Sequence, residues 1–110
     1  MKLKTINRSA ITIIPKQPYV NWADSFNDVK VYHKEFVTTI LIPDEYDDFN
    51  CEKFIKKTYK QIFEKELESW MADPDVWPKK RGYKVFKKWF DVIFSDMAWD
   101  YGDGDVKHDD

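Results

Sequence analysis

Apolar residues along this 110-residue chain follow two spacings, which together predict six elements of secondary structure. Two β-branched runs, 8–14 and 36–42, are each followed by a proline and predict strands. A third strand is predicted over 90–101, where apolar and polar residues alternate. Its apolar positions shift by one residue between Phe94 and Met97. The shift indicates either a bulge or a second half of the strand that is covered on its other face.

Three helices are predicted between these strands. The longest, over about 51–71, carries apolar residues at steps of three and four, and Asn50 is suited to cap its N-terminus. The same spacing predicts shorter helices over 18–26 and 82–90. Residues 27–35 lack periodicity and are expected to form a loop.

The order strand, helix, strand, long helix, short helix, strand predicts an α+β fold. We expect two layers, with a three-stranded, mainly antiparallel sheet and the helices packed on one of its faces. A chain of this length has room for one hydrophobic core. A single domain is therefore expected over 1–101, followed at 102–110 by an acidic, flexible tail.

Composition agrees with a globular domain, since 43% of the residues are hydrophobic and 35% are charged. No stretch approaches the roughly 20 apolar residues of a membrane span, and the first residues lack the apolar run of a signal peptide. Cys51 is the only cysteine, so an intramolecular disulfide is excluded. We expect a cytoplasmic protein without a membrane partner.

Charge is unevenly distributed along the chain. Residues 91–110 hold one Lys against seven Asp, whereas 1–90 hold 17 Lys and Arg against 13 Asp and Glu. Within the basic part, 79–89 interleaves six cations with three aromatic residues, a pattern that suits phosphates and stacked bases. The lysines expected to contact a nucleic acid are Lys80, Lys84, Lys87 and Lys88. An amphipathic helix with a solvated lysine face explains the same spacing, and we favour it.

Motifs of several enzyme classes are missing from the sequence. Neither His33 nor His108 has a partner at metal-ligand spacing, and a cysteine-based zinc site needs more than Cys51. The three glycines do not form a phosphate-binding loop. No nucleophile–base or acid–base pair can be named. We therefore expect no metal and no cofactor, and the balance is against an enzyme.

Aromatic residues make up 17% of the chain and include five tryptophans. Trp70 and Trp89 lie on the apolar stripes of predicted helices and are expected in the core. Trp22 and Trp77 lie beside prolines in short or irregular segments, so they are expected to face a partner.

The leading functional hypothesis is a protein-interaction module that binds a protein partner, or a second copy, through exposed aromatic residues. The residues expected to contribute are Tyr19, Trp22, Trp77 and Arg81. An alternative places a small-ligand or enzyme site near Trp22, Trp77 and Arg81, because ligand sites combine apolar walls with a few polar groups. Weak nucleic-acid binding through 79–89 is the other alternative.

Three segments of the chain resemble a family of small, uncharacterised bacterial proteins. These segments are N-R-S at 7–9 followed by P-Y-V-N-W at 18–22, the helix end E-L-E-S-W at 66–70, and W-P at 77–78 leading into Arg81 and F-K-K-W-F-D at 86–91. The resemblance covers most of the chain. It implies a single cytoplasmic α+β domain and brings no activity or catalytic residue with it.

Overall fold

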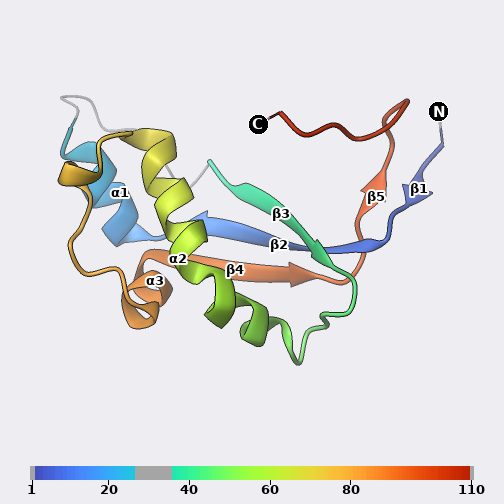
Figure 1. Ribbon diagram of the computed structural model, residues 1–110, viewed down its shortest axis with the longest axis horizontal. Helices are drawn as coiled ribbons and strands as arrows, with labels where there is room; N and C mark the ends of the chain where they lie inside the picture. Colours follow the sequence, from blue (N-terminus) through green and yellow to red (C-terminus); the bar gives the residue numbers. More distant parts are fainter. Residues whose placement is uncertain (1, 27–35, 110) are drawn as a thin grey trace.

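The structure, a computed structural model, describes residues 2–26 and 36–109. The elements along this part of the chain are β1 (Lys4–Thr5), β2 (Arg8–Pro15), α1 (Gln17–Asp24), β3 (Thr38–Pro43), α2 (Cys51–Trp70), the 3-10 helix η2 (Pro74–Val76), α3 (Tyr83–Trp89), β4 (Phe90–Ser95) and β5 (Trp99–Asp100). The predicted α+β fold is confirmed (Figure 1). The loop predicted over 27–35, with His33, lies outside the described residues.

A three-stranded antiparallel sheet, in the order β3-β2-β4, is the scaffold of the fold. On its inner face the fully buried Ile11 of the central strand lies between Ile40 of β3 and Phe94 of β4. On the outer face Leu41 and Ile93 are exposed. One face of the sheet is therefore covered by helices, as alternation along the strands predicts.

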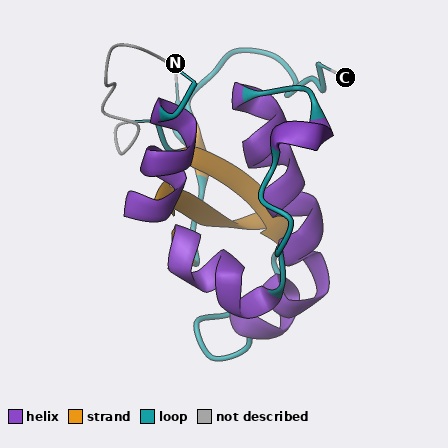
Figure 2. Ribbon diagram, turned by 90° about the vertical axis from the view of Figure 1, so that its left-hand side faces the viewer, coloured by secondary structure: helices purple, strands orange, loops and turns teal. Residues whose placement is uncertain are grey.

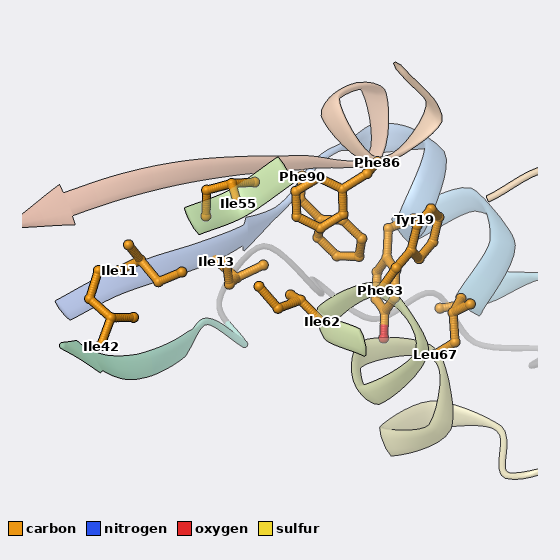
Figure 3. Packing of buried hydrophobic residues seen from close by; sticks show 11 residues of the cluster. Ile11, Ile13, Tyr19, Ile42, Ile55, Ile62, Phe63, Leu67, Phe86 and Phe90 are labelled. Atoms are coloured by element: carbon orange, nitrogen blue, oxygen red, sulfur yellow. The ribbon is translucent and has the colours of Figure 1, made fainter. Parts of the chain in front are cut away.

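Helix α2 crosses the inner face of the sheet (Figure 1). Its buried apolar residues recur at steps of one, four and seven and so lie on one side of the helix; they are Ile55, Ile62, Phe63 and Leu67. This side packs with Ile11, Ile13 and Ile42 of the strands into a single core (Figure 3). Each of these fully buried side chains stabilises the fold by about 1.5–3 kcal/mol.

Helices α1 and α3 lie at the end of the sheet where β2 ends and β4 begins. Figure 2, which looks at that end, shows the helices in front of the strands. Pro18 occupies the first turn of α1, where its missing N–H costs nothing. Just before α1, the main-chain N–H of Lys16 donates to the carbonyl of Trp89 at 2.8 Å. This bond joins the start of α1 to the junction of α3 and β4.

Aromatic rings from α1, α2, α3 and β4 meet in one cluster at this end of the core (Figure 3). The ring centroids of Tyr19 and Phe90 are 5.2 Å apart, and those of Phe63 and Trp89 are 5.5 Å apart. The tilted and edge-on geometries are those that aromatic pairs prefer. Trp89, expected in the core, is half-buried and packs against it.

The predicted third strand is split into β4 and β5. In the main sheet the last pair is Ala10 opposite Ser95, and pairing resumes in a separate two-stranded ribbon with Thr5 opposite Trp99. Four residues, 6–9, thus lie opposite three, 96–98, so the extra residue is on the N-terminal segment and not on the strand where a bulge was predicted. An extra residue on the partner segment does not move the apolar positions of 90–101, which change sides at the interruption 96–98. The alternative, a second half covered on its other face, is wrong because Trp99 is 58% exposed.

The cap predicted at the start of α2 does not form. Asn50 occupies the N-cap position, but its side chain makes no capping bond to the helix. Its Oδ1 instead accepts from the N–H of Asp47 at 2.6 Å, while the Asp47 carboxylate accepts from the N–H groups of Phe49 and Asn50. Asn and Asp side chains bond readily to nearby backbone groups in turns. Here they stabilise the turn before the helix, and the helix cap does not form.

Candidate functional site

Three tryptophans direct their indole N–H groups to main-chain carbonyls of distant or neighbouring segments. Trp22, Trp70 and Trp77 are all half-buried. Their acceptors, in the same order, are the carbonyls of Val76, Ala23 and Met71, at 3.0, 3.0 and 2.7 Å. Trp22 thereby joins α1 to the connection that follows α2, Trp70 joins the end of α2 to α1, and Trp77 closes the connection on itself.

The structure brings together three of the four residues predicted to bind a partner. Trp22 bonds next to Trp77, and the guanidinium of Arg81 lies 5.7 Å from the centroid of the Trp77 ring. Arg81 also donates to the carbonyl of Pro78 at 2.8 Å. Each of these side chains therefore has a partner within its own chain, and the group is not the most exposed aromatic surface of the protein.

The fourth predicted residue, Tyr19, belongs to the core. It is 5% exposed, and its hydroxyl donates to the carbonyl of Glu66 at 2.9 Å. Burial raises the pKa of Tyr19 to about 12. Burial also raises the pKa of the neighbouring Glu66 carboxyl above its usual range, although a hydrogen bond with Thr38 lowers it in part. Tyr19 thus stays protonated at neutral pH and serves as a structural donor.

A hollow of about 390 Å³ lies beside Arg81, but it is not the ligand site that the sequence predicts. Its walls are Tyr59, Lys60, Glu64, Lys79, Arg81 and Gly82. Neither Trp22 nor Trp77 lines it, so the expected apolar walls are missing. Among the residues that the structure describes, no group of three His, Cys, Asp or Glu side chains is arranged to hold a metal ion.

The basic helix α3 presents lysines without an open ring beside them. Lys80, Lys84, Lys87 and Lys88 are exposed, and Phe86 is fully buried. The Nζ of Lys87 lies 3.7 Å from the Glu52 carboxylate and 5.3 Å from the centroid of the Tyr83 ring. The Tyr83 hydroxyl donates to the same carboxylate at 2.9 Å. The ring best placed to stack on a base is therefore covered by a cation.

The largest exposed aromatic side chains of the C-terminal part lie on a ribbon that projects from the body. We call this ribbon the arm; it consists of residues 2–5 and 97–106 and includes β1 and β5. Trp99 is 58% and Tyr101 is 53% exposed, and Leu3, Met97 and Val106 are exposed as well. The arm lies at the opposite end of the molecule from α1 and α3 (Figure 1).

The register of the arm separates an apolar face from a charged one. Opposite residues of an antiparallel pair point to the same side, so Trp99 shares a face with Thr5. The same register continued by one residue sets Leu3 opposite Tyr101 on that face. Lys4 lies opposite Asp100 on the other face. The arm is therefore amphipathic, with its large apolar side chains on one side.

Carboxylates surround the base of the arm. The loop between β3 and α2 approaches the end of β4, and together they form a hollow of about 430 Å³ lined by Asp47, Asp48, Phe49, Phe94 and Asp96. Phe49, at the rim, is 97% exposed. This end of the protein thus combines exposed rings with negative charge.

Sequence reasoning did not select Leu3, Met97, Trp99 or Tyr101 as binding residues. The sequence did contain one signal. After Phe94 the apolar positions move to the side of the strand opposite those of β4, whereas a strand covered on one face keeps its apolar residues on that face. Whether this second apolar side is exposed depends on what packs against it, and only the three-dimensional structure shows that.

No protein-family model, curated protein or solved structure matches this chain. Within 2–26 and 36–109, no helix is both long enough and apolar enough to cross a membrane. The chemistry of the arm itself, large rings among carboxylates, is what points to a function.

Proposed function

We propose that this protein is a protein-interaction module and that the arm is its binding surface. The observation that carries the proposal is the exposure of Trp99 and Tyr101 on one face of a projecting ribbon. Tryptophan and tyrosine dominate interface hot spots because each buries a large, rigid area and keeps a polar tip that can bond at the rim. Exposed apolar groups gathered in this way mark interaction sites.

The shape of the molecule supports the proposal. The radius of gyration of the Cα atoms is 15.6 Å. A compact domain of this length has a radius of gyration of about 13 Å. The paired strands β1 and β5 of the arm extend beyond the layered body (Figure 1). A partner can therefore cover the apolar face of the arm without displacing any residue of the core.

The two alternative functions have less support. Neither Trp22 nor Trp77 lines the hollow at Arg81, so the pocket that the ligand-site alternative requires is not formed there. Lys80, Lys84 and Lys88 offer contacts for phosphates, but no open ring accompanies them for base stacking. Trp99 and Tyr101 on the arm, in contrast, are open to a partner.

Site-specific photo-cross-linking in an extract of the source cells tests the proposal. A photoreactive amino acid replaces Met97 on the arm or, as a matched control, the exposed Lys65 on α2. We expect discrete protein adducts from position 97 and none of the same adducts from position 65. The additional substitution Trp99→Ser should reduce the adducts from position 97 several-fold.

Equal adducts from both positions, or adducts that persist unchanged after Trp99→Ser, contradict a binding role for the arm. The far-ultraviolet circular dichroism of each variant provides the folding control, because Met97, Trp99 and Lys65 are all exposed.

A further inference from the structure

Another hollow, of about 440 Å³, lies beside α1 and away from the arm. It is formed by α1, the last turns of α2 and the segment that enters β3 (Figure 1). Rings and apolar side chains form much of its wall. Two of them, Phe36 and Val37, are 61% and 49% exposed, so the hollow is open to solvent on that side. Its volume is within the range of small-molecule sites, roughly 300–1,000 Å³.

The side chain of Glu66 is the unusual group in the wall of this hollow. Glu66 is 8% exposed and lies on the buried side of α2, one turn after Ile62. Glutamate is almost never buried in this way without a partner of opposite charge. The Thr38 hydroxyl, from the same hollow, donates to the Glu66 carboxylate. The ion pairs found between described residues all lie elsewhere, so within that part of the chain the carboxylate has no counter-charge.

Two further hydroxyls hold this part of the wall in place. Those of Tyr19 and Ser69 line the hollow, and both donate to the main-chain carbonyl of Glu66, at 2.9 and 2.7 Å (Figure 3 shows the Tyr19 hydroxyl at α2). The site therefore combines apolar walls with a few fixed polar groups, as small-molecule sites do. Burial of the carboxylate without a counter-charge costs free energy, and a ligand that supplies the charge offsets that cost.

We propose that this hollow binds an organic cation, a primary ammonium group that carries an apolar substituent. The ammonium donates to the Glu66 carboxylate and provides its counter-charge. The substituent packs on Phe36, Val37 and Trp70, whose aromatic rings also attract a cation. An anion would meet the carboxylate as a like charge, and a neutral ligand would leave it without a counter-charge. This site is separate from the arm, so the inference goes beyond the proposed function.

Binding of small probes to the full chain, measured by isothermal titration calorimetry, tests the inference. Phenethylamine, phenethyl alcohol and hydrocinnamate share a ring and differ in charge. Mildly alkaline pH favours the ionised carboxyl and keeps the amine protonated. We expect phenethylamine to bind about tenfold more tightly than the alcohol, with hydrocinnamate weakest. Ethylamine, which lacks the ring, should bind several-fold more weakly than phenethylamine because it leaves the apolar wall uncovered.

One variant and one measurement on the native protein locate the site. Glu66→Gln should reduce the affinity for phenethylamine to that for the alcohol. The matched control Glu68→Gln removes the same charge from an exposed position of α2 and should leave both affinities unchanged. In the native protein, phenethylamine should shift the NMR signals of the Thr38 amide and the Trp70 indole N–H, and leave the indole N–H of Trp99 unchanged.

Several results would overturn the inference. Equal affinities for the amine and the alcohol, or an affinity for the amine that survives Glu66→Gln, reject a cation site. Absence of binding by every probe rejects it too, as do NMR shifts confined to other surfaces. If Glu66→Gln does not fold, the probe comparison and the signals of the native protein decide the question. Cross-linking from position 97 tests the arm separately, so either proposal can fail without the other.

Discussion

Single side chains in this protein often serve two purposes at once. Trp22 packs its ring on Tyr19 with centroids 5.5 Å apart and donates its N–H to Val76, 54 positions later in the chain. A tryptophan that is only half-buried can therefore hold two distant segments together. A partly exposed ring is therefore not always available for binding. An indole N–H that bonds to a carbonyl of the same chain shows that the side chain has a structural role.

The substitution Trp22→Phe should lower the free energy of unfolding by about 1–3 kcal/mol, because it removes one hydrogen bond and part of a packed ring. Urea denaturation followed by circular dichroism measures the change. Trp99→Phe, the control on the arm, should shift the stability by less than about 0.5 kcal/mol. Equal losses in both variants would show that the bond to Val76 contributes nothing.

The buried carboxyl of Glu66 makes stability depend on pH. Its pKa is raised in the folded protein, so the folded state binds this proton more tightly than the unfolded state does. The stabilisation is complete below the ordinary pKa of 4.5 and is lost as pH rises through the folded value. Glu66→Gln keeps an acceptor for Thr38 and removes the titration.

We therefore expect Glu66→Gln to match the native protein near about pH 4 and to be more stable than it at about pH 7. Urea midpoints at the two pH values give the comparison. The exposed control Glu68→Gln should show no such divergence. A destabilised Glu66→Gln protein at neutral pH would mean that the charged carboxylate itself supports the fold.

The strands of the fold differ sharply in how many partner strands and buried side chains stabilise them. The central strand β2 has a partner on both sides and two fully buried isoleucines, Ile11 and Ile13. In contrast, β1 and β5 pair only with each other, over two residues each, and their side chains are largely exposed. Local stability follows the burial and pairing of each segment.

Amide hydrogen exchange should reveal this difference. Amides of Ile11 and Ile13 should exchange only on global unfolding, whereas the amides of Thr5 and Trp99 should exchange through local opening, faster by orders of magnitude. Mass spectrometry of peptic fragments or NMR can measure both groups. Comparable protection of the arm and of β2 would contradict the picture of an independently opening ribbon.

The elements that sequence patterns predicted are those with long apolar stripes. Helix α2 spans 20 residues, and its periodic apolar face fixed both its type and its bounds to within a residue. Strand β1 is only two residues long and forms because β5 lies beside it, so no local sequence pattern predicts it. The role of Asn50 was mistaken for a related reason: whether its side chain caps the helix or closes the preceding turn depends on competing geometries a few residues apart.

The candidate binding residues depend more on the tertiary arrangement than the elements of the fold do. Trp22 and Trp77 were selected because prolines lie beside them, but the acceptors of their N–H groups, Val76 and Met71, come from the tertiary arrangement. Trp99 carried the better signal, a change in the side of the strand on which apolar residues lie. Patterns of alternation reveal a second apolar face, but they do not say whether the protein covers it.

The whole molecule is a layered body with a projecting arm. The body, residues 6–96, holds 15 Lys and Arg against 15 Asp and Glu, and the unpaired segments 6–9 and 96–98 separate it from the arm. The aspartates of the arm and the lysines of α3 have opposite charges, which raises the question of whether the arm folds back. In the described structure β1 and β5 project from the body, the chain after β5 turns back toward the middle of the molecule (Figure 1), and the described aspartates of the arm form no ion pair with the lysines of α3.

Small-angle X-ray scattering tests this arrangement. An extended arm predicts a radius of gyration close to the 15.6 Å of the Cα trace, nearly constant between low and high salt. A value near about 13 Å at low salt, rising with salt, would show instead that the arm collapses electrostatically onto the body. Data at several protein concentrations separate this effect from association between molecules.

The placement of the tryptophans also gives the protein a built-in optical reporter. Trp22, Trp70, Trp77 and Trp89 are all packed against the core, whereas Trp99 stands alone on the arm. A neutral quencher such as acrylamide should therefore reach one fluorophore much faster than the other four, and emission from that fluorophore should be red-shifted by water. A bound partner would shield it and shift its emission to the blue. Occupancy of the arm can thus be followed in the unlabelled native protein by light alone.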